Sequence, residues 1–162
     1  MNKDNFSHWL SLVANFGVIV GIVFLTLEIN QTNLIAMVSA EYEFRNSGAL
    51  INESIYTNPE LAAFVYHINN TEQEEFTEVE HQRAYALALR LLNLWLGAES
   101  AYRSGIASEM IYNNILDDIR NGNIDTSPAM RKIWRELISD YSALGSTVVF
   151  TTIDQLLREQ GN

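Results

Sequence analysis

The sequence predicts an all-α protein in which one N-terminal transmembrane helix continues into a bundle of about five further helices. Three observations support this fold class. An uncharged apolar stretch near the N-terminus has the length of a membrane span, helix-capping residues recur along the rest of the chain, and apolar residues there keep helical spacing. We expect residues 1–28 to form an N-terminal tail and the transmembrane helix, and residues 29–162 to form a soluble α-helical bundle domain.

The apolar stretch lies between Asp4 and Glu28, where 23 residues include no Asp, Glu, Lys or Arg. As a helix it would be about 34 Å long, which exceeds the roughly 30 Å of a bilayer's hydrocarbon core. Trp9, near one end, suits the headgroup level. The alternatives are a buried helix of a soluble bundle and a cleaved signal peptide, although the stretch is long for a signal and no small-residue cleavage site closes it. Too few Lys and Arg residues flank the stretch to decide its orientation.

The span carries two sets of residues that could contact other helices. Gly17 and Gly21 form a G-x-x-x-G motif, which allows two helix backbones to approach closely in lipid. The predicted helix–helix contact face consists of Leu10, Ala14, Gly17, Gly21 and Phe24. The polar face consists of Ser11, Asn15 and Thr26. Two such faces predict a homo-oligomer or a larger membrane complex; alternatively, the glycines are incidental and Asn15 bonds within its own monomer.

The remaining helices follow from their capping residues. The membrane helix is expected to continue to about Ser54, and Asn58 with Pro59 opens a short helix through Ile68. Further helices are expected over 78–104, over 108–122 from Ser108, over 127–141 from Ser127 and Pro128, and over 147–160. The last of these contains the stretch TVVFTT, whose β-branched residues have low helix propensity.

Two successive capping boxes are expected ahead of the longest helix after the span. Thr71 with Glu74 and Thr77 with Glu80 both have the required spacing. Gly105 is expected to close that helix.

Composition excludes several classes of protein. The formal net charge of −10 argues against a nucleic-acid partner, because phosphate neutralisation needs clustered Lys and Arg. The sequence has no cysteine, which excludes disulfides, thiolate nucleophiles and cysteine-ligated metals. No Ser-His-carboxylate set or glycine-rich phosphate loop is recognisable. We therefore expect no enzyme activity and no cofactor.

Only half of a di-metal motif is present, in Glu78 and His81, which are spaced i and i+3. A carboxylate-bridged site needs a second Glu-x-x-His and two further glutamates, so no metal site is expected. The acidic residues at 72–80 suit a solvated first helical turn, although a loose cation site there is an alternative. Trp95, Trp134 and Tyr102 are expected to pack in the core.

Arg90 is the one charge within the apolar stretch AYALALRLLNLWLGA. A charge on so apolar a helix must find a partner or reach water, so Arg90 is expected to be a buried charge paired with a carboxylate of another helix. Glu41, Glu43 and Asp140 are the candidate partners. The alternatives are a ligand-anchoring arginine beside a pocket and a side chain that snorkels to solvent. Glu99 and Arg103, spaced i and i+4, are expected to pair with each other.

Several stretches together resemble a loose family of small, uncharacterised bacterial proteins with an N-terminal membrane helix and a helical domain. The stretches are EINQTN after the span, then LNLWLGAESAYRSGI, SPAMRKIWRELISDY and TIDQLLRE. The resemblance covers nearly the whole chain and implies a single-pass protein of the bacterial inner membrane, with the side of the helical domain undecided. Family members tend to carry arginines just after the span, where this chain has uncharged residues at 30–33. No activity comes with the resemblance.

These observations predict a membrane-anchored, non-enzymatic helical protein that self-associates or acts as an accessory or scaffold subunit of a membrane complex. One alternative is a membrane-tethered helical sensor or ligand-binding domain, which a cavity beside Arg90 would favour. Another is an ion-conducting homo-oligomer, which a ring with Asn15 and Thr26 facing inward would favour.

Overall fold

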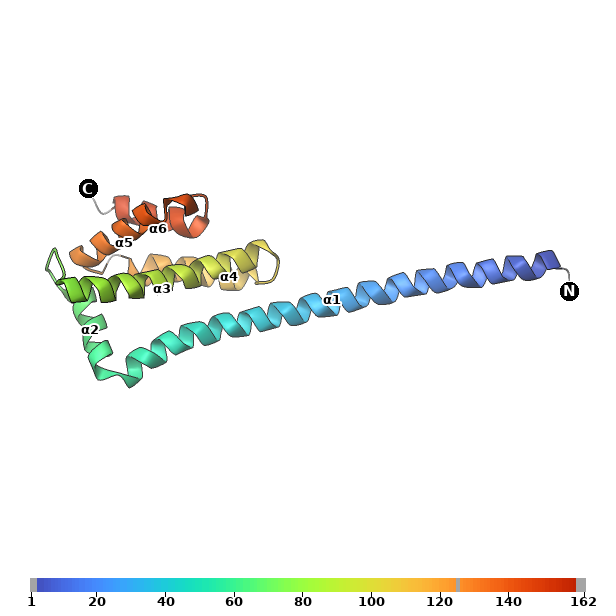
Figure 1. Cartoon of the computed structure of the whole chain (residues 1–162), viewed down its shortest axis with the longest axis horizontal. Helices are drawn as coiled ribbons and strands as arrows, with labels where there is room; N and C mark the ends of the chain where they lie inside the picture. The colour runs from blue at the N-terminus through green and yellow to red at the C-terminus, as the bar shows by residue number, and fades with distance from the viewer. Residues whose placement is uncertain (1–2, 125, 160–162) are drawn as a thin grey trace. The chain divides into compact units, whose positions relative to one another are not determined.

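The computed structural model describes residues 3–124 and 126–159 and is all-α over these ranges. Its helices are α1 (Lys3–Thr57), α2 (Pro59–Asn70), α3 (Glu78–Arg103), α4 (Glu109–Asp118), α5 (Pro128–Asp140) and α6 (Val148–Glu159) (Figure 1). A π-helical turn (Ile119–Asn123) extends α4, and a short 3₁₀ turn (Ser142–Leu144) precedes α6. The all-α class is confirmed, and five α-helices follow α1 in the described residues, as expected.

The chain divides into two compact units between Val38 and Ser39. The boundary predicted from the sequence, between residues 28 and 29, lies ten residues nearer the N-terminus than this one. It was placed directly after Glu28, the first charged residue that follows the apolar stretch. In the structure the side chains of residues 8–36 are exposed, apart from the half-buried Val20. The first unit therefore consists of the N-terminal part of α1 alone.

The core of the second unit forms around α3, which packs against α4, α5 and α6. Trp95 of α3 and Trp134 of α5 are fully buried and stack with ring centroids 5.6 Å apart. The indole N–H of Trp95 donates to Asp118 Oδ2 at 2.9 Å, so its one polar group is satisfied. The expected core role of the two tryptophans is confirmed. Tyr102 is half-buried and stacks on Tyr112 at 4.4 Å.

Local capping explains where three of the helices begin. The Asn58 side chain accepts from the first backbone N–H groups of α2, and Ser127 Oγ accepts from Met130 N at the start of α5. Thr77 and Glu80 form a complete capping box at the start of α3. Gly105, with φ of 71°, follows the end of α3 in the left-handed conformation that glycine adopts without strain. These predictions are confirmed.

Two capping predictions are wrong. No helix begins at Thr71, because α2 continues to Asn70 and Thr71 is its C-terminal cap. The Thr71 hydroxyl instead accepts from Gln73 N within a turn. Ser108 precedes α4 but makes no side-chain capping bond; its hydroxyl donates to Glu41 Oε1 of α1 at 2.6 Å. Both sequences fit the capping pattern, but the Thr71 hydroxyl accepts within a turn and the Ser108 hydroxyl donates to another helix.

Candidate functional site

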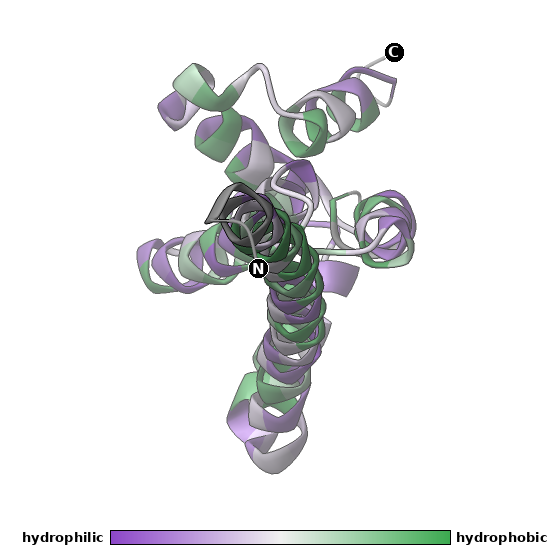
Figure 2. Cartoon of the chain, turned by 90° about the vertical axis from the view of Figure 1, so that its right-hand side faces the viewer, coloured by the Kyte–Doolittle hydropathy of each residue, from purple (hydrophilic) through white to green (hydrophobic). Residues whose placement is uncertain are grey.

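The first candidate site is the apolar N-terminal part of α1. The most apolar 18-residue window of this helix has a mean hydropathy of 2.4, and none of it is buried within the chain. Trp9, Phe16 and Phe24 are 68%, 66% and 67% exposed. Hydrophobic residues occur over much of the helix (Figure 2). Exposed apolar surface of this extent is typical of segments that contact lipid or protein.

The predicted contact face is open in the single chain. A Cβ placed on Gly17 or Gly21 would meet nothing within 4 Å, and Leu10, Ala14 and Phe24 of the same face are exposed. Ser11 and Asn15 of the polar face are exposed as well. The hydroxyl of Thr26 donates to the Ile22 carbonyl at 2.9 Å, so its donor is used within its own helix. A helix-contact role for either face stays a prediction.

The second candidate site is a groove in the second unit between α1, α3 and α4. Its volume is about 480 Å³, within the range of about 300–1,000 Å³ that is typical of small-molecule sites. A neighbouring hollow of about 420 Å³ lies between α1, α2 and α3. Arg90 and Ile51 line both, so the two hollows meet at these residues.

Arg90 is not a buried charge, and the prediction that it is buried is wrong. Its side chain is exposed, and among the described residues it makes no ion pair or hydrogen bond. Two of the candidate partners are engaged elsewhere: Glu41 accepts from Ser108, and Asp140 accepts from the Tyr85 hydroxyl at 2.8 Å. The physical reason is that α3 is apolar on more of its circumference than the core covers. Apolar neighbours in the sequence therefore did not imply burial.

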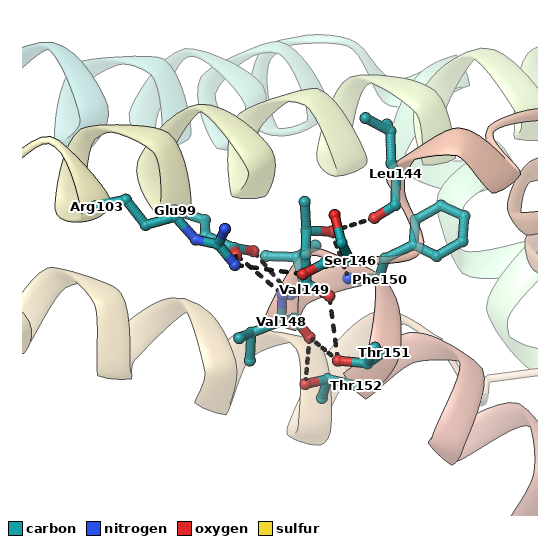
Figure 3. Close-up of polar contacts among 10 residues, drawn as sticks. Glu99, Arg103, Leu144, Ser146, Val148, Val149, Phe150, Thr151 and Thr152 are labelled. Atoms are coloured by element: carbon teal, nitrogen blue, oxygen red, sulfur yellow. Dashed lines mark hydrogen bonds and ion pairs between the residues drawn. The ribbon is translucent and has the colours of Figure 1, made fainter.

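Among the described residues of the second unit, the buried charge is Glu99, whose side chain is 2% exposed. Its two carboxylate oxygens accept from Val148 N and Val149 N, each at 2.9 Å. Arg103 lies 2.5 Å from Glu99 Oε1, which confirms the predicted pair. Figure 3 shows both side chains of α3 directed at the first turn of α6.

Glu99 explains why the β-branched stretch at the start of α6 is helical. The first backbone N–H groups of a helix lack partners within it, and the Glu99 carboxylate satisfies two of them. Thr147 Oγ1 accepts from Phe150 N at 3.3 Å and satisfies a third. The carboxylate charge also interacts favourably with the helix dipole. Glu99 thus fastens α6 to α3, and this role is structural.

A row of polar side chains joins α3 to α5. Burial, together with the hydrogen bond to Asp140 and its charge, raises the pKa of Tyr85 to about 12. His81 Nε2 lies 2.8 Å from Glu136 Oε2, and the His81 ring stacks on Tyr85. Glu78, the other half of the di-metal motif, is exposed. Within the described ranges, no three His, Asp or Glu side chains converge as metal ligands do.

Comparison of the chain with protein families, with curated proteins and with solved structures gives no match. The resemblance to a family of bacterial membrane-helix proteins therefore stays an expectation. Two features of the structure bear on function, namely the exposed apolar part of α1 and the groove beside Arg90.

Proposed function

We propose that the chain is a membrane-anchored, non-enzymatic helical protein that self-associates or serves as an accessory or scaffold subunit of a membrane complex. The observation that carries the proposal is the apolar window of α1, none of which is buried within the chain. Lipid tails can cover an exposed helix that is predominantly apolar, and about 34 Å of uncharged helix is enough to cross them. The resemblance of the sequence favours a single pass through the bacterial inner membrane.

The rival explanations of an apolar helix fit this chain less well. A core helix of a soluble bundle would be covered by its own chain, whereas Phe16 and Phe24 are two-thirds exposed. A cleaved signal is normally followed by a small-residue cleavage site. Here α1 runs without a break from Lys3 to Thr57. In this proposal the apolar segment stays part of the helix.

Self-association through the span rests on Gly17 and Gly21. Lipid supplies no hydrophobic drive between helices, so association depends on close packing and on bonds between polar groups. Both glycines face open space in the single chain, which leaves room for a neighbouring backbone. An isoleucine at either position would hold two such helices apart.

Two measurements on the full chain test the proposal. Membrane anchoring predicts that the protein stays in the membrane pellet after a carbonate wash, and release into the supernatant would refute it. Self-association predicts that replacing both Gly17 and Gly21 by Ile lowers the mass of the detergent-solubilised particle. The matched control is Gly48→Ile, at another open glycine of α1 outside the predicted span. An unchanged mass in the double variant would refute the glycine interface without affecting the anchor.

A second candidate function is a ligand-binding or sensor domain held at the membrane. The groove beside Arg90 favours it, because an exposed arginine that makes no ion pair with any described residue lies where two apolar-lined hollows meet. Such a site combines a large apolar surface with one polar group that fixes orientation, as small-molecule sites commonly do. The test is whether a larger side chain that fills the groove abolishes saturable binding of a small ligand.

A further inference from the structure

We propose that the groove beside Arg90 binds a free single-chain carboxylic acid of the fatty-acid type. The carboxylate lies on the Arg90 guanidinium, and the alkyl chain follows α3 past Gly97 toward Ala101. This inference rests on the second candidate function and is independent of the membrane anchor and of self-association.

Small residues keep the groove open. Its lining includes Gly97, Ala98 and Ala101 of α3, together with Ala40 and Ser47 of α1. Larger side chains at these positions would occupy the space, as they do in a close-packed interior. The groove therefore follows from the residues that line it.

Gly97 is the most informative of these residues. A Cβ on Gly97 would meet nothing within 4 Å, so the space does not require a glycine there. Glycine within a helix costs about 1 kcal/mol relative to alanine. The packing of the protein gives Gly97 no role, whereas a bound alkyl chain could approach α3 closely at this glycine.

The shape of the groove suits one extended chain. Phe44, Leu50, Ile51 and Leu94 supply apolar walls. From Arg90 to Ala101 the helix rises about 16 Å, the length of a medium alkyl chain. Next to Ala40, the hydrogen bond from the Ser108 hydroxyl to Glu41 joins α1 to the beginning of α4.

The charges favour an anionic head at Arg90. A guanidinium can donate two parallel hydrogen bonds to a carboxylate, and Arg90 has no competing ion pair in the described part of the chain. Glu43 also lines the groove and is exposed, so its charge disfavours an anion near it. Arg83 and Glu60 both line the neighbouring hollow. The junction of the two hollows is therefore where the anionic head belongs, with the alkyl chain directed into the larger groove.

The experiment uses the full chain in nanodiscs of phosphatidylcholine, with empty nanodiscs as the blank. The probe is undecanoic acid that carries a terminal dansyl group, whose fluorescence rises in an apolar site. The methyl ester of the same probe has the same tail without the charge. The variants are Gly97→Leu, which fills the groove, and Arg90→Gln, which removes the cation. Arg135→Gln is the control, at an exposed arginine of α5 that does not line the groove.

We expect saturable binding of the acid to the wild type and to Arg135→Gln. Gly97→Leu abolishes it without lowering the thermal midpoint, and Arg90→Gln weakens it about tenfold or more, as for the loss of a charge-assisted bond. Equal signals in wild type, Gly97→Leu and empty nanodiscs would overturn both the ligand and the binding function of the groove. Acid and ester binding equally well, with loss in Gly97→Leu, would keep the binding function and overturn the anionic ligand.

Discussion

Replacement of Glu99 by Gln is expected to destabilise the helical bundle by about 3 kcal/mol. A glutamine oxygen can accept from one of the two N–H groups that Glu99 now satisfies, while its NH₂ group faces the other donor. A buried donor without a partner costs about 1–3 kcal/mol. Loss of the negative charge at the beginning of α6 adds about 1 kcal/mol. The loss of the contact with Arg103 adds little, because that side chain is 54% exposed and keeps water as a partner.

The assay is thermal unfolding of the detergent-solubilised full chain, followed by tryptophan fluorescence. Trp95 and Trp134 are buried in the bundle and report its melting. For a chain of this size, about 3 kcal/mol corresponds to a fall in Tm of roughly 6–12 °C. The matched control is Arg103→Gln, which leaves both backbone bonds to Glu99 in place and should cost about 1 kcal/mol or less. Equal losses in the two variants would show that the ion pair, and not the helix cap, holds α6.

Three further predictions use the same unfolding assay. Arg90→Ala should change stability by less than about 0.5 kcal/mol, because Arg90 is exposed and unpaired among the described residues; a loss of several kcal/mol would mean that it is buried after all. Gly97→Ala should raise stability by about 1 kcal/mol, and a decrease would show that its Cβ has no room. The pKa of Tyr85 is raised from 10.0 to about 12, so the unfolded chain ionises first and stability falls as pH rises from 10 to 12; Tyr85→Phe should remove this component, and an identical pH profile would refute it.

The capping predictions that succeeded depend on residues close together in the sequence. Asn58 caps α2 through backbone groups two and three residues away, and Thr77 with Glu80 caps α3 within one turn. The atoms that form such bonds lie within one helical turn of each other, so the local sequence can indicate them, although Ser108 shows that the bond does not form at every helix start. Thr71 shows the limit of this reasoning. Thr71 and Glu74 have the spacing of a capping box, but α2 continues up to Thr71 and no new helix begins there.

The sites could be predicted only in part. Glu99 accepts from residues 49 and 50 positions later in the chain, so no local pattern indicates its burial. The one available signal was indirect: the β-branched start of α6 needed a cap, and an acidic residue elsewhere could provide it. The groove likewise could not be predicted from the local sequence alone. The sequence identified Arg90 as unusual, but whether it meets a carboxylate, water or a cavity depends on the distance between α1 and α3.

Three apolar parts of this chain differ in how they are covered, and the difference explains what hydropathy can predict. Residues 8–36 of α1 are exposed apart from Val20, α3 around Arg90 is covered on one face, and Trp95 of the same helix is completely enclosed. Hydropathy measures the cost of leaving such residues in water, which is high for all three. Hydropathy does not specify which helix or molecule shields these residues from water. For Trp95 the cover includes α5. Both functional proposals assign the cover of the groove and of the apolar part of α1 to molecules outside the chain.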